Sequence, residues 1–393
     1  MYKIIALSQK TLIIILRICY FWAYSKVMRK LLLYFIFIGM LAACGTAKQI
    51  NTENIKLTFL DDFILADDLE IGGTKVGGLS GIDYCDGNYY LVCDKRGDPR
   101  FYKASIDINQ KSIDTVIISE VIELDRSVPF LKNMTLDMEG IRYDPEKGEI
   151  VLSSEGAILQ GKDPSVFRVT PDGKFISNYD IPAYFNASEK QKPRNNGVFE
   201  GLAQDYEQTG YWVGMELPLR KDGSKPKLFY SKSPVRITNF NKESRVATTQ
   251  FTMQVEGTTK IPWMYYAVNG LTELLEYAPN RFLVLERAFS AGHGSNGNTV
   301  RIFDVDARNA TNTLEFQNLR KQDYTPATKK LVFDFKSVRN QLKEKIIDNI
   351  EGMTFGPDLP NGNKTLILVS DNNFSSFGRQ ISQIILMEVE IKN

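Results

Sequence analysis

A short motif that recurs five times constrains the fold of this 393-residue chain more than any other feature. Each copy has a small or acidic residue, then Gly, then an aliphatic residue, and after a turn a β-rich run that ends on an acid. The first marked residues are Ser80, Glu139, Glu200, Asn269 and Glu351, and the closing acids are Asp94, Glu155, Glu216, Glu286 and Asp371. In every copy the midpoint between the two marked residues falls on turn-forming residues. Because opposed residues of an antiparallel pair share a midpoint with their turn, each copy predicts a hairpin whose marked residues meet at one end.

Further β-rich runs follow each hairpin and predict a four-stranded blade, the building unit of an all-β propeller. These runs are Phe101–Ile106, Ile113–Ile122, Ser165–Thr170, Lys174–Ile181, Lys227–Tyr230, Val235–Phe240, Thr299–Asp304 and Leu331–Phe335. Only Gln383–Ile391 follows the last hairpin, so the run Ile55–Leu65, ahead of the first hairpin, is expected to complete that blade and close the ring. Five blades are visible, and six or seven stay open because long intervals separate some copies; one interval holds a predicted helix at Ser337–Ile347. A sandwich or solenoid does not explain why both chain ends supply strands to one unit.

The N-terminal region has the parts of an export signal. Residues 28–43 carry a basic head, an apolar run and small residues directly before Cys44. This order resembles the bacterial lipoprotein box, in which the cysteine is acylated and becomes the first mature residue. The alternative is a transmembrane anchor over residues 12–41, but Lys26, Arg29 and Lys30 divide it into halves shorter than the roughly 20 residues that a span needs.

The sequence therefore divides into a leader, a tether and one domain. Residues 1–43 form the leader, of which 1–27 is interpreted as an extension from a misassigned start; residues 44–54 form the tether and residues 55–393 the propeller. Gly45, where an inner-membrane retention signal would have Asp, favours the outer membrane and leaves its face open. The expected partners are the membrane, through a lipid on Cys44, and a small ester or phosphoester substrate, and the protein is expected to be a monomer.

The overall charge is nearly neutral only because of the leader. Residues 1–43 hold six basic residues and no acid, which leaves 42 basic against 47 acidic residues in the remainder. This balance gives no electrostatic reason to bind nucleic acid. In the exported chain Cys85 and Cys93 do not face each other across their hairpin, and we expect two buried, unpaired thiols.

The repeated acids predict a cation site. Gathered at one mouth of the axial channel, they would repel one another unless a cation or an arginine neutralises them. Candidate arginines are Arg96, Arg142, Arg168, Arg287 and Arg301. Oxygen-rich sites suit Ca²⁺, which could polarise an ester and activate water. The predicted metal ligands are Asp94, Glu139, Glu155, Glu200, Glu216, Glu286, Glu351 and Asp371.

Four residues are predicted to act in catalysis: Glu139, Glu200, Arg287 and His293, the only histidine of the chain. His293 lies in a Gly-rich loop after the fourth hairpin and could serve as a base. The alternative is that the acids accept structural hydrogen bonds and that His293 is a surface residue.

A family resemblance rests on the motif segments taken together, which are Gly78–Ile82, Asp137–Ile141, Asn196–Leu202, Phe282–Arg287, Asn349–Met353 and Leu368–Phe374. They resemble the phytase-like family known as "esterase-like activity of phytase", from about residue 75 to the C-terminus. The resemblance implies a propeller and an esterase-type activity, but no catalytic set. Ser80 and Asn269 stand where the other three copies have Glu.

Three functions follow as hypotheses. The first is a lipid-anchored, metal-assisted hydrolase of phosphate or carboxylic esters. The second is a non-enzymatic propeller that binds glycans or proteins, and the third is a Ca²⁺-dependent lactonase-like propeller.

Overall fold

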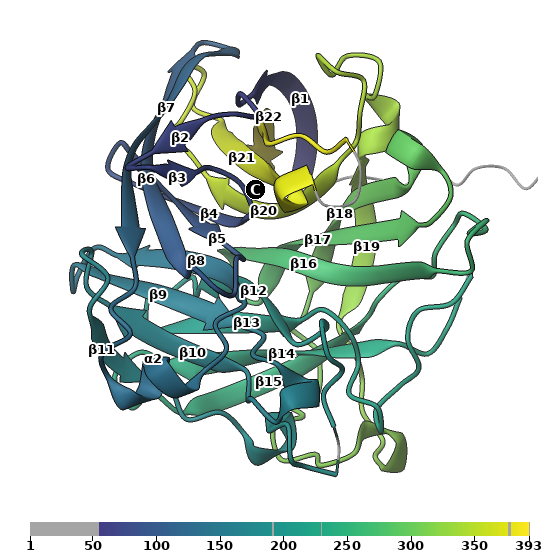
Figure 1. The fold of residues 1–393 in the computed structure, drawn as a ribbon. Coiled ribbons are helices and arrows are strands. Elements are labelled where there is room, and N and C mark those ends of the chain that lie inside the picture. The colour runs from purple at the N-terminus through teal and green to yellow at the C-terminus, as the bar shows by residue number, and fades with distance from the viewer. Residues whose placement is uncertain (1–54, 191, 229, 376–378, 393) are drawn as a thin grey trace, which may run out of the picture. The chain divides into compact units, whose positions relative to one another are not determined.

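The computed structural model describes residues 55–190, 192–228, 230–375 and 379–392. The predicted signal peptide, the lipid-bearing Cys44 and the tether lie outside these residues. Within them the all-β propeller prediction is confirmed, because five four-stranded antiparallel sheets surround one centre (Figure 1). No helix in the described part of the chain has the length and apolar character needed to cross a membrane.

The blades follow one another along the chain. Blade 1 contains β4 (Leu79–Cys85), β5 (Asn88–Cys93), β6 (Arg100–Asn109) and β7 (Ser112–Glu123). Blade 2 contains β8 (Met138–Asp144), β9 (Glu149–Ser154), β10 (Ser165–Val169) and β11 (Phe175–Asn178). Blade 3 contains β12 (Phe199–Gln204), β13 (Gly210–Met215), β14 (Pro234–Asn241) and β15 (Ala247–Gln254). Blade 4 contains β16 (Ala267–Ala278), β17 (Arg281–Ser290), β18 (Asn298–Asp306) and β19 (Thr328–Asp334). Blade 5 contains β20 (Asn349–Phe355), β21 (Lys364–Asp371), β22 (Gln383–Ile391) and β1 (Ile55–Ile64).

The remaining elements are short. They are the ribbon β2 (Glu70–Ile71) and β3 (Thr74–Lys75), the helix α2 (Pro129–Asn133), and the 3₁₀ turns η1 (Ile158–Gln160), η2 (Ala183–Phe185), η3 (Gly294–Asn296), η4 (Leu319–Lys321), η5 (Phe335–Ser337) and η6 (Asn373–Ser375).

The two ends of the domain close the ring, as predicted. Strand β1 pairs antiparallel with β22, from Ile55 opposite Ile391 to Ile64 opposite Gln383. Blade 5 is thus built from the first strand and the last three strands of the domain. The sheet count settles the number of blades at five.

Glycines let the innermost strands pack closely around the axis. A Cβ added to Gly81 on β4 would lie 2.6 Å from the carbonyl oxygen of Glu139 on β8. A Cβ on Gly352 of β20 would lie 2.8 Å from the Cα of Gly81. The Gly that follows the marked residue therefore permits neighbouring inner strands to approach backbone to backbone.

Hydrophobic side chains fill the space between adjacent blades. One cluster joins blades 4 and 5 through residues such as Leu283, Ile302 and Ile350, all fully buried. Another joins blades 1 and 2 through Val92, Ile141 and similar residues. The ring is held together by this apolar packing between sheets.

Two local predictions are wrong. The segment predicted as a helix at Ser337–Ile347 forms η5 followed by separate turns, because Asp62 of β1 accepts the backbone N–H of Lys343 and holds the chain in an irregular path. The third strand of blade 3 is β14, which contains the predicted run Val235–Phe240, and its outer strand is β15; the run Lys227–Tyr230, expected as a strand of this blade, contributes no strand to the sheet. Strand β15 alternates polar and apolar residues, and the long β18–β19 connection pairs with it at Gln250 and Thr252.

The two faces of the ring differ in their loops. Each inner strand begins on the face where its hairpin acid lies, which we call the mouth face. The connections between consecutive blades, including residues 179–198 and 335–348, lie on this face. Short turns such as Asp86-Gly87 lie on the opposite, far face, and so does the long β18–β19 connection of residues 307–327. Ile55 also lies there because it pairs with the end of β22. Loops on a rigid scaffold are the usual position of a functional site.

Candidate functional site

The marked residues meet at one end of each hairpin, but they are not directly opposed as predicted. In blade 2 the register changes between Met138 and Gly140, so that Glu139 is the extra residue of a β-bulge. The backbone N–H of Glu155 consequently donates to the carbonyl of Asp137, at 2.9 Å, and not to that of Glu139. Blades 1, 3 and 5 have a similar irregularity at their own marked residue, so the pairing is displaced by two residues in each.

Eight carboxyl groups gather at the mouth face, and we call them the mouth cluster. They come from blades 1, 2, 3 and 5 and are Asp94, Asp137, Glu139, Glu155, Glu200, Glu216, Glu351 and Asp371. Seven of them are predicted ligands, and Asp137 is an addition that the bulge creates.

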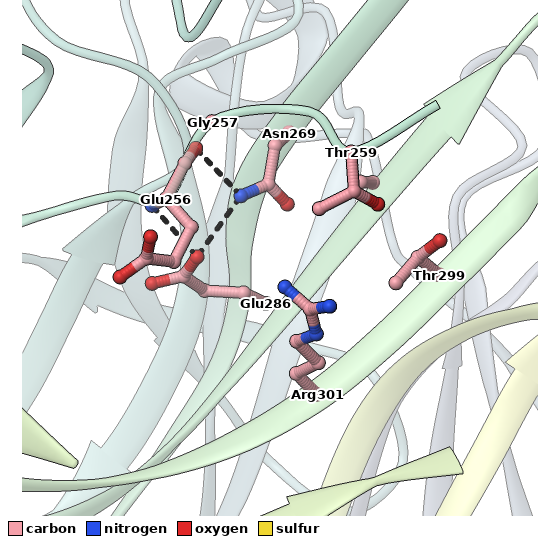
Figure 2. A pocket seen from close by; sticks show the side chains of 8 residues that line it. Glu256, Gly257, Thr259, Asn269, Glu286, Thr299 and Arg301 are labelled. Carbon is pink, nitrogen blue, oxygen red and sulfur yellow. Dashed lines mark hydrogen bonds between the residues drawn. The ribbon is translucent and has the colours of Figure 1, made fainter. Parts of the chain in front are cut away.

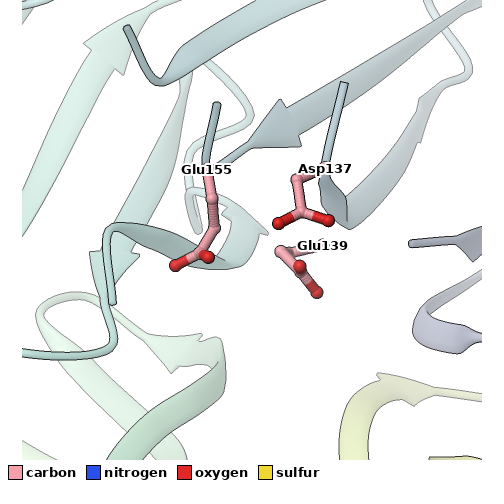
Figure 3. A group of neighbouring side chains, drawn as sticks. All are labelled: Asp137, Glu139 and Glu155. Carbon is pink, nitrogen blue, oxygen red and sulfur yellow. The ribbon is translucent and has the colours of Figure 1, made fainter. Parts of the chain in front are cut away.

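Blade 2 contributes three of these carboxyls to one point. Figure 3 shows the side chains of Asp137, Glu139 and Glu155 directed toward one another. One oxygen from each lies within 4.8 Å of the others. Glu155 is also part of a second triad, with Glu200 and Glu216, that meets the same 4.8 Å limit. The two triads therefore share one carboxylate.

The donor set and its dimensions fit Ca²⁺. This ion takes carboxylate oxygens at about 2.3–2.6 Å, so two of its ligands lie at most about 5 Å apart. Both triads meet this limit, and they contain only oxygen donors, as a hard cation requires.

Burial and mutual repulsion raise the pKa values of the cluster. Burial is the larger cause for Glu155 and Glu216, whose pKa values rise from 4.5 to about 7. Burial, and then the charge of Asp371, raises the pKa of Asp94 to about 8. Burial is also the main cause that raises the pKa values of Glu139 and Glu200 well above 4.5; the charge of Glu200 adds to the rise for Glu139, and the charge of Glu155 adds to the rise for Glu200. Such a cluster favours either protons or a bound cation.

Two arginines compensate part of this charge. Arg287 on β17 donates from Nη2 to Oε1 of Glu351 at 2.8 Å, and Arg96 forms an ion pair with Asp137. The carboxylate of Glu155 accepts the backbone N–H groups of Gly197 and Val198. Eight acids thus face two arginines.

Two carboxylates of the cluster, those of Glu139 and Glu216, accept no hydrogen bond from an N–H or hydroxyl group of the described residues. Glu200 instead shares a hydrogen bond with the carboxyl group of Glu155, which requires a proton on one of the two. Glu200 and Glu216 are nevertheless only 8% and 6% exposed. Buried carboxylates without donors are unfavourable unless another group satisfies them.

Glu286 does not join the cluster, although the motif predicts it. Its carboxylate forms an ion pair with Lys329 and accepts from Nδ2 of Asn269 at 2.9 Å. In blade 4 the bulge lies at Thr272, beyond the motif Gly, so Glu286 pairs with Leu271 deeper in the sheet. Arg287 takes the place at the mouth that an acid has in the other blades.

Glu286 borders a cavity of about 10 Å³ in blade 4, which is room for one water molecule (Figure 2). Its lining consists of Glu256, Gly257, Thr259, Asn269, Glu286, Ala288, Thr299 and Arg301. The guanidinium of Arg301 donates to Asp334 at 2.9 Å. This candidate arginine therefore neutralises a surface acid and not the mouth cluster.

His293 also lies apart from the cluster. Its ring centroid is 5.3 Å from that of Trp263, and its Nε2 lies 2.9 Å from the carbonyl oxygen of Ile261. No ion pair joins it to a carboxylate in the described part of the chain. The geometry thus associates His293 with a surface loop.

Arg142, another candidate, closes the axis below the cluster. It lies 3.0 Å from Glu273 of β16 and donates to the carbonyl oxygens of Ile82 on β4 and Met353 on β20. Glu273 in turn accepts the backbone N–H of Leu202 on β12 at 2.9 Å. One buried ion pair therefore connects all five inner strands, and the mouth cluster lies on the mouth-face side of this pair.

Two remaining predictions concern Arg168 and the cysteines. Arg168 pairs with Glu149 at 2.9 Å within blade 2, away from the cluster. Cys85 and Cys93 are unpaired, as expected, and Cys93 is buried whereas Cys85 is half-buried. Asp137 and the pairing of Arg96 with it were missed; the Gly at position 140 was the available signal, because Gly inside a strand often marks a bulge.

Comparison with known proteins identifies a family. Residues 74–374 match the family model described as "Phytase-like: Esterase-like activity of phytase". No curated protein sequence matches the chain.

Solved structures share a similar architecture at low identity. The major allergen Mala s 1 of Malassezia sympodialis is 10% identical, with a TM-score of 0.39 and 84% of each chain covered. The exo-β-1,3-galactanase 1,3Gal43A of Clostridium thermocellum is 10% identical, with a TM-score of 0.44, over 84% of this chain and 63% of the other. A member of the DUF4221 family from Bacteroides vulgatus is 9% identical, with a TM-score of 0.40, over 86% of this chain and 99% of the other.

Proposed function

The chain belongs to the phytase-like family, and we propose that it is a cation-assisted hydrolase of phosphate or carboxylic esters that acts at the mouth cluster. One observation carries this proposal: two triads of carboxylates, each with oxygens within 4.8 Å, share Glu155 and include two acids, Glu139 and Glu216, without a donor among the described residues. A Ca²⁺ ion would satisfy the acids that the protein leaves unsatisfied.

The residues of the mouth cluster and Arg287 have different roles in the proposed reaction. Glu139, Glu155, Glu200 and Glu216 would hold the cation, which supplies polarisation of the ester oxygen and activation of water. A carboxyl group whose pKa lies near 7, such as Glu351 at about 7, can exchange a proton with the leaving group. Arg287 would bind an anionic ester, because its guanidinium lies beside the cluster, where its Nη2 is 2.8 Å from Glu351.

Metal binding and turnover test this proposal separately. Calorimetric titration with Ca²⁺ should show binding that Glu155→Gln weakens at least tenfold, since Glu155 belongs to both triads. Glu243→Gln is the matched control, because Glu243 is an exposed acid that pairs with Lys147. Turnover of aryl phosphates or aryl acetates should require the same ion. Absence of both binding and turnover would remove the proposal.

A binding propeller without catalysis is the second candidate. It is favoured by the hydrogen bonds that Glu155 accepts from Gly197 and Val198, because these give the acid a structural role. In that case Glu155→Gln should lower the melting temperature by the same amount with and without Ca²⁺.

We also propose that the protein is an outer-membrane lipoprotein acylated at Cys44. Ten residues separate Cys44 from Ile55, which lies on the far face. Metabolic labelling with a fatty acid, lost in Cys44→Ser, tests the anchor.

A further inference from the structure

An aromatic surface lies on the mouth face between blades 3 and 4. The loop of residues 255–266 connects β15 to β16 and exposes five large side chains within six residues. We call this surface the aromatic platform, and it consists of Ile261, Trp263, Met264, Tyr265 and Tyr266. Tyr265 is 99% exposed and Trp263 is 76% exposed. Contiguous exposed apolar side chains mark interaction sites more often than single ones do.

Backbone hydrogen bonds hold the platform in place. The N–H of Trp263 donates to the carbonyl of Ala291 at 3.0 Å, and the N–H of Ala291 donates to the carbonyl of Tyr266 at 2.9 Å. The side chain of His293 contacts the same loop at the carbonyl oxygen of Ile261 and at the ring of Trp263. The structure therefore presents these rings on a fixed backbone, and Tyr265 does so at a φ of 55°, which a non-Gly residue adopts at a cost.

The platform adjoins the mouth cluster. Tyr266 is followed after three residues by Gly270, whose added Cβ would lie 2.3 Å from Cγ of Glu216. Burial raises the pKa of Tyr266, the charge of Glu216 raises it further and that of Arg287 lowers it, so both charges act on the phenol. The Tyr266 end of the platform thus lies beside the mouth cluster.

The platform carries no free charge. The two residues of its loop that are charged at neutral pH are paired elsewhere: Lys260 Nζ donates to the carbonyl of Asn298 at 2.8 Å, and Glu256 pairs with Lys329 at 3.2 Å. A neutral surface beside the charged mouth cluster matches a ligand that has a neutral ring and a charged or polar group attached to it. Trp and Tyr also suit a partner with one apolar face and polar edges, because their own rings combine an apolar body with a polar atom.

We propose that the aromatic platform binds a pyranose ring, so that the substrate is an ester carried by a saccharide. In this proposal the C–H face of the sugar ring stacks on Trp263 and Tyr265, and the hydroxyl groups of the sugar point toward the mouth cluster. The ester then lies at the mouth cluster. The identification of the ester rests on the function proposed above, whereas ring binding does not.

Trp263 reports directly on its own occupation. Of the three tryptophans, Trp22 lies in the predicted leader and Trp212 is buried, so Trp263 is the exposed emitter of the domain. The emission that differs between the parent protein and Trp263→Phe is assigned to the platform. We would titrate methyl pyranosides of the gluco, galacto, manno and xylo series, glucose 1-phosphate, and sorbitol as an acyclic polyol.

The proposal expects saturable quenching or a blue shift with at least one pyranoside and none with sorbitol. Tyr265→Ala should weaken that binding at least fivefold, whereas Tyr206→Ala should not, because Tyr206 is an exposed tyrosine in a turn on the far face. Melting curves confirm that both variants are folded. Unchanged Trp263 emission with every pyranoside, or equal losses in the two tyrosine variants, would overturn the proposal.

Chelation separates this inference from the proposed function. With EDTA present, the methyl pyranoside should still bind, while glucose 1-phosphate should lose its advantage over it. If the methyl pyranoside binds and Ca²⁺ changes no binding, the cation-assisted hydrolase is refuted and sugar binding by the aromatic platform is supported. If Ca²⁺ changes the binding of glucose 1-phosphate but no methyl pyranoside binds, sugar binding by the platform is refuted and the cation site is supported.

Discussion

The charge of Glu216 should destabilise the folded protein when no cation is bound. The side chain is 6% exposed, and burial is the main cause that raises its pKa from 4.5 to about 7. Well below pH 4.5 the carboxyl is protonated in both the folded and the unfolded chain, so its ionisation does not change the free energy of unfolding. As pH rises from 4.5 to about 7, the unfolded chain ionises first and stability is lost.

The size of this effect follows from the pKa interval. At about 1.4 kcal/mol per tenfold change, the difference between 4.5 and about 7 corresponds to roughly 3 kcal/mol at pH 8. Glu216→Gln keeps the shape and removes the charge, so it should stabilise the chelated protein. With an unfolding entropy of about 2.1 cal/mol/K per residue, the melting temperature should rise by about 4 °C.

Added Ca²⁺ should reverse the sign of the change in melting temperature that Glu216→Gln causes. Glu216 is then a ligand, and an ion present at about 100 times its dissociation constant contributes about 2.7 kcal/mol to stability. The Gln variant should lose much of that contribution and melt below the parent protein. Scanning calorimetry at pH 5 and pH 8, with EDTA or Ca²⁺, measures all four cases.

The outcome that contradicts this reasoning is specific. If Glu216→Gln melts lower than the parent in EDTA at pH 8, the folded protein already stabilises the Glu216 charge, through Arg287 or another donor. The mouth cluster would then be a structural feature and not a cation site.

Three further predictions concern the arginines and glycines around the axis. Arg287→Gln should lower the unfolding free energy by about 3–5 kcal/mol in EDTA at pH 8, and should increase the rise in melting temperature that Ca²⁺ produces. Gly140→Ala should cost about 1–3 kcal/mol in urea unfolding, because its Cβ would lie 2.5 Å from Leu202 Cβ, whereas Gly97→Ala, with no atom within 4 Å, should cost under about 0.5. Arg142→Met should destabilise by about 3–5 kcal/mol, and the double change with Glu273→Met should recover most of that loss; equal losses in the single and double variants would contradict it.

The repeat predicted the propeller because it combines two periods. Alternating strands and turn residues fix the hairpin, and the spacing of the copies fixes the blades. The pairing of Ile55–Ile64 with the C-terminal strand followed from the blade that lacked a strand. Local pattern and global fold agree in these segments.

The site was less predictable because a bulge changes which side chains meet. Counting to a midpoint assumes equal numbers of residues on both strands, and the extra Glu139 breaks that assumption. Asp137 therefore faces Glu155, and Arg96 pairs with Asp137. Whether a bulge forms before or after the Gly depends on packing against the next inner strand, which sequence spacing does not contain.

Loop positions were the least predictable. His293 follows β17 by three residues, so the sequence places it near the mouth but does not give its direction. The ring turned out to lie against Trp263, which is 30 residues away in sequence. Contacts between two loops depend on the whole ring, and no periodicity reports them.

The pairing of β1 with β22 has a consequence for the order of folding. Lys56 pairs with Glu390, so blade 5 joins residues separated by more than 300 positions, and it cannot form until its last strand has been synthesised. Non-local pairing of this kind is slow, because loop closure precedes the contacts that reward it. Until β22 pairs with it, β21 has an open strand edge, which is prone to aggregation. A chain truncated before Gln383 should therefore be cleaved by proteases faster than the complete chain, so that closure of the ring acts as a check on complete synthesis.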